Sequence, residues 1–303
     1  IIFAIFAAIV DRGDKVVYPI PSWNNNHYTY LAGGTAVPIV VGPETNFLPT
    51  AEMLRAHVRD ARMICISTPV NPTGTVMSRD EAKAIAQLVV DENSRRGAHG
   101  ERPLFLMWDQ IYWMLTFGDN RHYTPPELVP EASRWTIFVD GISKCFAATG
   151  LRVGWTVAPP HITSRMRDIL GHVGAWAPRA EQVATAKFMG MRDEIAKFHE
   201  HMIRELQLRL DLLYDGFMAM KRDGLPVDAI APQGAIYLSA QFRIPGRTNE
   251  EIRKLMLDRA GFAMVAFQAF GLKKEDGWFR LSAGAVSPAQ IEAGLARVRA
   301  VLA

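Results

Sequence analysis

The first half of the chain alternates short apolar runs with amphipathic helical segments, and this alternation constrains the fold more than any other feature. The runs expected to form strands cover residues 15–18, 36–40, 63–67, 104–109 and 136–140. Strands separated by helices are joined by crossover connections, which make neighbouring strands parallel and cover the sheet with helices. The sequence therefore predicts an α/β fold with a mostly parallel sheet.

Capping residues mark where several helices of this half begin. Ser78 is followed three residues later by Glu81, a capping box for a helix that runs toward Asn93. Thr50 can cap a helix that ends near Val58. The polar stretch 94–102 contains glycines and predicts a loop.

The second half has a different pattern. One long helical tract is expected from about residue 161 to about Lys221, with a break at Pro178. Strands are expected at 235–239, 263–267 and 278–282, with helices capped by Thr248 with Glu251 and by Ser287 with Gln290. A chain of 303 residues is long enough for two unequal domains. We therefore predict a large domain over residues 1–165, then a long interdomain helix and a smaller α+β domain over residues 166–303.

Composition argues against several classes of partner. The net charge is only +3, and no dense basic stripe with interleaved aromatic residues suggests a nucleic-acid surface. The apolar opening run, residues 1–10, is too short to span a membrane and predicts the end of a buried helix. Cys65 and Cys145 lie in apolar contexts without metal-ligand spacing, which is typical of a reduced cytoplasmic protein.

Candidate site residues follow the points where the apolar runs end. Asp109 ends one run, Asn71 and Trp23 follow two others, and Ser143 and Lys144 follow a fourth. In open α/β sheets the ligand lies beyond the carboxyl ends of the strands. We therefore expect these side chains to share one site.

Lys144 and Arg152, eight residues apart among glycines, combine two functional groups that few reactions need together. An amine that forms a Schiff base must be partly desolvated and flanked by cationic or polar groups so that its pKa falls. An arginine, which is always charged and fork-shaped, suits a phosphate monoester.

Five motifs, in this order, resemble the pyridoxal-phosphate-dependent aminotransferases of fold type I, the class I/II family. The resemblance spans nearly the whole chain and is specific in combination. The motifs are Asn71-Pro72-Thr73-Gly74, Asp109-x-x-Tyr112, Ser143-Lys144, Gly150-Leu151-Arg152-Val153-Gly154 and Phe279-Arg280-Leu281-Ser282-Ala283-Gly284.

This resemblance implies roles for the ring-binding residues. Lys144 would hold pyridoxal phosphate as an internal aldimine and later move the proton between the substrate Cα and the cofactor. Asp109 would pair with the pyridinium nitrogen, which keeps the ring able to accept electrons. Tyr112 and Asn71 would hydrogen-bond the phenolate oxygen of the cofactor, and Trp23 would stack on the pyridine ring.

The resemblance also implies the anion-binding residues. Ser143 and Arg152 would hold the cofactor phosphate, and Arg280, with Asn71, would bind the substrate α-carboxylate. One position departs from the family pattern: the residue three before the lysine is often a phosphate-binding serine, and here it is Gly141.

Two further expectations come from the resemblance. Family members carry an upstream segment with a phosphate-binding loop and a partner-facing arm, so this sequence is expected to be an N-terminally truncated member. Family members build each site from both chains, so a homodimer acting on an amino acid and a 2-oxo acid is expected.

Three alternatives to an aminotransferase stay open at this point. A lyase, decarboxylase or synthase would keep the cofactor and the fold but break another bond at Cα, since fold does not fix the reaction. A regulator would fuse the same module to a DNA-binding domain and sense the cofactor. A chain without the phosphate loop would be inactive.

Overall fold

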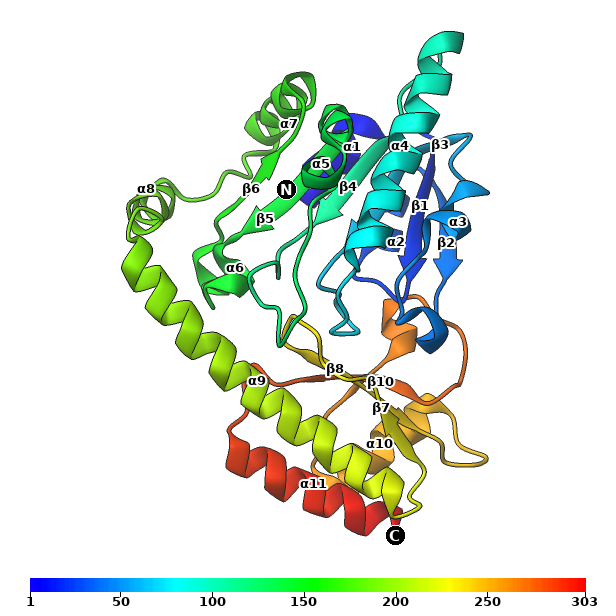
Figure 1. Ribbon diagram of the computed structural model, residues 1–303, viewed down its shortest axis with the longest axis vertical. Coiled ribbons are helices and arrows are strands. Elements are labelled where there is room, and N and C mark those ends of the chain that lie inside the picture. The colour runs from blue at the N-terminus through cyan, green and yellow to red at the C-terminus, as the bar shows by residue number, and fades with distance from the viewer.

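The computed structural model describes all 303 residues and arranges them around two β-sheets (Figure 1). The larger sheet has the strand order β2-β1-β3-β4-β5-β6 and the smaller one β7-β8-β10-β9. The strands are β1 (Lys15–Ile20), β2 (Thr35–Val40), β3 (Ala61–Ser67), β4 (Phe105–Asp109), β5 (Thr136–Gly141), β6 (Gly154–Val157), β7 (Val227–Ala229), β8 (Tyr237–Phe242), β9 (Val265–Ala266) and β10 (Trp278–Ser282).

The larger sheet confirms the predicted α/β fold. Strands β1 to β5 pair in parallel, and only β6 runs antiparallel, beside β5. The central strand β3 is buried along almost its whole length, as a parallel strand covered on both faces must be. The helices of this half are α1 (Ile2–Ile9), α2 (Asn25–Leu31), α3 (Ala51–Arg55), α4 (Arg79–His99), α5 (Pro125–Leu128), α6 (Ile142–Cys145) and α7 (Pro160–Val173).

Two short strands were absent from the prediction. Strand β6 has four residues, all of intermediate or full exposure, and β7 has three residues, of which two are buried. An alternating apolar pattern takes four to eight residues, so β7 is too short to show one and β6 is at the lower limit of that range. Strand β6 matters for the site because it carries the chain back antiparallel to β5, next to Lys144.

Helix α4 is longer than predicted, and the expected loop at 94–102 is wrong for residues 94–99, which are helical. The helix continues to His99 and ends at Gly100, which adopts the left-handed conformation. Buried Arg96 bonds to Glu92 Oε1 at 2.7 Å and donates to the carbonyl oxygens of Val58 and Ala61, both at 2.7 Å. These tertiary contacts stabilise a last turn that the local composition does not favour.

The long helical tract divides into three helices. These are α7, α8 (Arg179–Phe188) and α9 (Arg192–Arg222). The break at Pro178 is confirmed, because Pro178 is the residue before α8 begins. A second break around Gly190, between α8 and α9, was not predicted.

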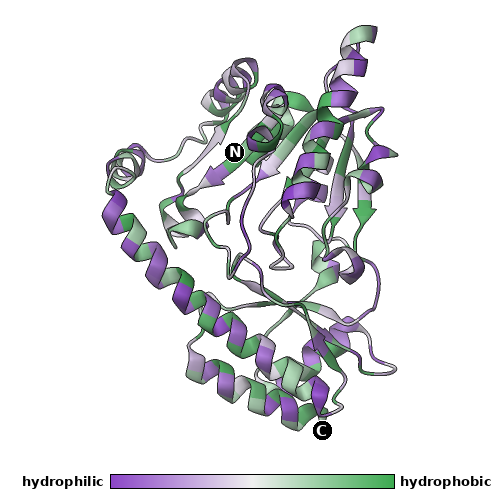
Figure 2. Ribbon diagram, in the orientation of Figure 1, coloured by the Kyte–Doolittle hydropathy of each residue, from purple (hydrophilic) through white to green (hydrophobic).

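Helix α9 connects the two sheets (Figure 1). Near its start, His199 Nε2 lies 2.7 Å from the carbonyl oxygen of Cys145, the residue after Lys144. Near its end, Leu210 and Phe217 are fully buried in the core of the smaller sheet. Polar and apolar residues alternate along it, as expected of a helix with one buried face (Figure 2).

The smaller sheet is completed by two capped helices, α10 (Asn249–Ala260) and α11 (Pro288–Leu302). Both predicted capping boxes are present, at Thr248 with Glu251 and at Ser287 with Gln290. Its strands pair antiparallel throughout, and its hydrophobic core is separate from that of the larger sheet.

None of the helices combines the length and the apolar character that crossing a membrane requires.

Candidate active site

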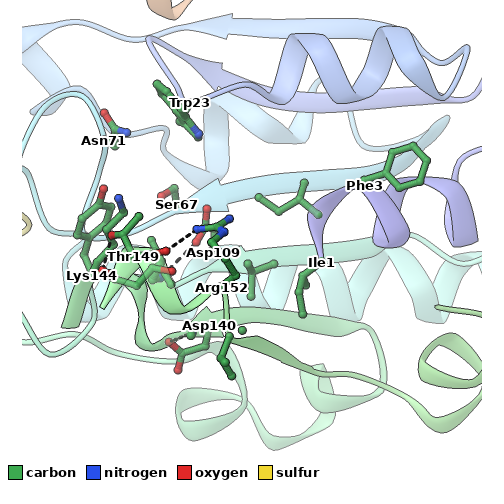
Figure 3. Close-up of a pocket in the computed structure, with 18 of the residues that line it drawn as sticks. Ile1, Phe3, Trp23, Ser67, Asn71, Asp109, Asp140, Lys144, Thr149 and Arg152 are labelled. Carbon is green, nitrogen blue, oxygen red and sulfur yellow. Dashed lines mark hydrogen bonds between the residues drawn. The ribbon is translucent and has the colours of Figure 1, made fainter. Parts of the chain in front are cut away.

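All eight residues proposed from the sequence line one cavity of about 520 Å³. Figure 3 shows part of its wall, where side chains from the ends of several strands face a common space. The larger sheet contributes residues that follow β1, β3, β4 and β5, and the smaller sheet contributes residues of β8 and β10. The eight predicted residues are Trp23, Asn71, Asp109, Tyr112, Ser143, Lys144, Arg152 and Arg280.

Lys144 lies on α6, a single helical turn that directly follows β5. Its side chain is half-buried, and partial burial lowers the pKa of the amine, helped by the positive charges of Arg152 and Arg280. A larger fraction of the amine is therefore unprotonated and nucleophilic near neutral pH.

Arg152 sits in the turn that joins α6 to β6, with a left-handed backbone (φ 58°). Its Nη1 donates to the carbonyl oxygen of Thr149 at 2.8 Å, and Thr149 Oγ1 donates to the carbonyl oxygen of Ser143 at 2.7 Å (Figure 3). These two bonds tie the arginine to the turn that carries Lys144. Thr149 also lines the cavity, and its only signal in the sequence is its position before the glycine-arginine motif.

The departure at Gly141 has a steric reason. Gly141 on β5 lies opposite Gly154 on β6, and a Cβ on residue 141 would lie 2.8 Å from both the Gly154 Cα and the Val153 carbonyl oxygen. Neither backbone atom can move aside as a flexible side chain would. A serine therefore does not fit here, and residue 141 offers no hydroxyl to an anion beside Arg152.

Gly141→Ser is expected to destabilise the chain by about 1–3 kcal/mol, because the new side chain is forced against backbone atoms. The matched control is Gly150→Ser, since a Cβ on residue 150 meets no atom within 4 Å. Urea unfolding of both variants measures the difference. Equal stability of the two variants would show that the β5–β6 pair adapts without cost.

Asp109, the last residue of β4, is a buried carboxylate without a cation. Its Oδ1 accepts a hydrogen bond from the Ile111 N–H at 3.2 Å, and no lysine, arginine or histidine forms an ion pair with it. Burial raises the pKa of this carboxyl to about 6, and the charge of Asp140 adds to the rise. A buried carboxylate of this kind favours a ligand that brings a positive charge to it.

Arg280, on β10, reaches the cavity from the smaller sheet. Its Nη1 donates to Asn71 Oδ1 at 3.0 Å, and its Cζ lies 4.6 Å from the ring centre of Tyr237 and 5.0 Å from that of Phe270. Its buried Nε has no hydrogen-bond partner. A guanidinium held on both sides with an N–H left free fits a carboxylate.

Tyr112 and Trp23 complete the wall. The Tyr112 hydroxyl lies 2.8 Å from that of Tyr237, and burial raises the pKa of Tyr112 above its usual value. Trp23 is half-exposed, with its ring centre 6.2 Å from that of Phe270. Tyr237 was missed from the sequence because it lies in an apolar run that reads only as a core strand.

The donor set fits pyridoxal phosphate. An amine with a lowered pKa suits an aldehyde, a buried carboxylate without a cation suits a protonated ring nitrogen, and an exposed arginine in the neighbouring turn suits a phosphate. These three groups are provided by Lys144, Asp109 and Arg152.

Comparison with known proteins identifies a single family. The sequence model of the family "Aminotransferase class I and II" matches residues 1–298. The chain is 28% identical over 278 residues to the aspartate aminotransferase of Geobacillus stearothermophilus, covering 89% of this chain and 66% of that protein. It is 30% identical to the aspartate aminotransferase of Pyrococcus abyssi, covering 98% of this chain and 72% of that protein.

Solved structures agree with these sequence matches. Aspartate aminotransferase from Thermus thermophilus with maleate superposes with a TM-score of 0.88 at 27% identity, covering 99% of this chain and 73% of that one. Aromatic aminotransferase from Pyrococcus horikoshii gives the same TM-score at 29% identity, covering 99% and 76%. The chain thus spans 66% to 76% of the length of these four proteins.

All four relatives are aminotransferases, so the comparisons support that interpretation and do not favour the lyase, decarboxylase or regulator alternatives. This chain belongs to the aminotransferase class I and II family, a family of pyridoxal-phosphate-dependent enzymes.

Proposed function

We propose that this chain moves an amino group between an α-amino acid and a 2-oxo acid, with pyridoxal phosphate bound at Lys144. One observation carries the proposal: the amine of Lys144, the cation-free carboxylate of Asp109 and the guanidinium of Arg280 face the same cavity. The cofactor, when bound, supplies the electron sink that stabilises the negative charge left at the substrate Cα when its proton is removed. The protein supplies binding, orientation and proton transfer.

Seven residues that line the cavity would hold the cofactor. Asp109 brings a buried negative charge to the ring nitrogen, and Arg152 brings a positive charge to the phosphate. The seven are Trp23, Asn71, Asp109, Tyr112, Ser143, Lys144 and Arg152.

Lys144 would also move the proton. A general base works best when its pKa lies near the working pH, and both partial burial and the two nearby arginines lower the pKa of this amine. Once Nζ is free, it can take the proton from the substrate Cα and deliver it to the cofactor in the same cavity. The same nitrogen therefore serves as cofactor anchor and as base.

Arg280 would bind the substrate α-carboxylate, with Asn71 beside it. The 3.0 Å bond to Asn71 Oδ1 holds the guanidinium in place before the substrate arrives. Binding one end of the substrate at a fixed point brings Cα to the reactive centre.

Arg280→Ala is expected to lower kcat/KM for every amino-acid substrate by about 100-fold, because a charge-assisted pair with the carboxylate is lost. Cofactor binding is expected to persist, measured by the visible absorbance of the protein with pyridoxal phosphate. Arg280→Lys keeps the charge but not the forked guanidinium, so its kcat/KM is expected to lie between those of the parent and of Arg280→Ala. Exposed Arg247→Ala is the control, and unchanged kcat/KM in Arg280→Ala would refute the assignment.

We also propose that the chain acts in the cytoplasm as a homodimer. Cys65 and Cys145 are both buried and unpaired, which suits a reducing compartment. Trp176, Val183 and Met189 are large apolar side chains exposed on and beside α8, as surfaces covered by a second copy commonly are. Light scattering after size-exclusion chromatography tests the dimer.

The division into a large domain over residues 1–165 and a second part over 166–303 remains our proposal. It is supported by two sheets with two separate hydrophobic cores. Limited proteolysis tests it, since a domain boundary is cut before either core.

A further inference from the structure

Tyr237 fills the space between Tyr112 and Arg280. It belongs to β8 of the smaller sheet and is 6% exposed. Its hydroxyl lies 2.8 Å from that of Tyr112, with the two rings edge to face at 5.7 Å and 74°. Its ring lies 4.6 Å below the Cζ of Arg280. One side chain thus contacts a residue next to the larger sheet and a residue of the smaller one.

The backbone around Tyr237 is held against the loop that carries Asn71. A Cβ on Gly74, whose φ is +73°, would lie 2.2 Å from the carbonyl oxygen of Tyr237. The N–H groups of Gln233 and Gly234 donate to the Gly74 carbonyl oxygen at 3.0 and 2.9 Å. Loop and strand therefore pack closely, which holds the backbone of Tyr237 in place beside this loop.

The hydroxyl pair has a definite hydrogen-bond requirement. The titratable groups that face Tyr112 are Tyr237, Asp109 and Arg280, and Lys144 lies in the same cavity. A phenol carries one O–H and accepts through its oxygen. Tyr112 can donate into the cavity only if Tyr237 donates to Tyr112, and a phenol that accepts a hydrogen bond becomes a stronger donor.

We propose that Tyr237 is a positioning residue with two separable tasks: its hydroxyl directs the Tyr112 hydroxyl into the cavity, and its ring holds the Arg280 guanidinium. The inference rests on the proposed function, in which Tyr112 donates to the phenolate oxygen of pyridoxal phosphate. It assigns to one residue of β8 a link between the cofactor side and the carboxylate side of the site.

Two substitutions separate the tasks. Tyr237→Phe keeps the ring and removes the hydroxyl, so Tyr112 donates less well to the phenolate oxygen. The deprotonated chromophore loses stabilisation, and the pH midpoint of the visible absorbance should rise by about one unit. The dissociation constant of 3-phenylpropionate, a carboxylate without an amino group, should stay within about twofold, because the ring remains over Arg280.

Tyr237→Leu removes both the hydroxyl and the ring. It should raise the pH midpoint by a similar amount and also weaken 3-phenylpropionate about tenfold, since the cation–π contact is lost. Tyr112→Phe should raise the midpoint at least as much as Tyr237→Phe. Adding Tyr237→Phe to Tyr112→Phe should then change nothing more, because the two hydroxyls act as one pair.

The experiment is a pH titration of absorbance and a binding titration on each cofactor-loaded protein. Tyr18→Phe is the matched control: Tyr18 is a buried tyrosine of β1 outside the cavity, and its loss should leave the midpoint unchanged. A Tyr237→Phe midpoint equal to that of the parent overturns the inference alone. A parent that takes up no cofactor at Lys144 overturns the proposed function and this inference together.

Discussion

Lys144→Ala is expected to abolish transamination, with a fall in kcat of at least about 10⁴-fold. Proton transfer by a positioned side chain contributes about 10²- to 10⁴-fold, and the covalent anchor for the cofactor is lost as well. The measurement is borohydride reduction of the protein with pyridoxal phosphate, followed by mapping of the labelled peptide. The parent should carry the label on Lys144, and the variant should carry none.

Lys144→Arg tests whether charge or nucleophilicity matters. Arginine keeps the positive charge but stays protonated and forms no Schiff base, so it should be as inactive as alanine. Lys83→Ala, at an exposed position of α4, is the matched lysine control and should label and turn over like the parent. Label on another lysine of Lys144→Ala, with activity retained, would move the site away from α6.

Asp109→Asn is expected to stabilise the cofactor-free chain above pH 6 while impairing the enzyme. The Asp109 carboxyl has a folded pKa of about 6 against 3.8 for the free group. Because the folded pKa is raised, the free energy of unfolding is highest below pH 4, where the carboxyl is neutral in both states. It falls as the pH rises through 6. The ionised, unpaired carboxylate then costs about 3 kcal/mol, and asparagine carries no charge.

The asparagine amide replaces a carboxylate oxygen by an NH2 group that has no established acceptor, which costs about 1 kcal/mol. The net gain for Asp109→Asn is therefore about 2 kcal/mol above pH 6, changing to a loss of about 1 kcal/mol near pH 4. Urea unfolding across this pH range measures both. With cofactor bound, the parent should be more stable than Asp109→Asn. The kcat of the variant should fall at least about 100-fold because the ring nitrogen loses its counter-charge. A variant no more stable than the parent at pH 7 would contradict the buried charge.

The residues that line the candidate site were easier to predict from the sequence than the contacts between them. Lys144, Asp109 and Arg152 belong to short motifs in which each residue type has a chemical reason, so sequence alone nominated them. Tyr237 has no such motif, because a tyrosine in an apolar strand looks like core until the fold brings its hydroxyl to Tyr112. The steric requirement at Gly141 likewise depends on a strand, β6, that was too short to predict.

The fold was predictable where local pattern and tertiary packing agree. The parallel strands β1 to β5 and the capped helices α10 and α11 have their own signals in the sequence. The last turn of α4 has none, since Arg96 stabilises it through carbonyl groups about 35 residues away in the chain. The break at Gly190 follows no proline and shows only when α8 and α9 are seen to diverge.

The length of helix α9 limits which insertions and deletions the chain can tolerate. The helix has 31 residues, with the His199 contact beside Lys144 in its first half and residues of the smaller sheet's core in its second half. Inserting or deleting one residue between these two parts shifts one relative to the other by about 1.5 Å and rotates it by about 100°. Either change would misalign Arg280 and Tyr237 with Lys144. Natural variants and engineered insertions therefore have to preserve the length of this helix.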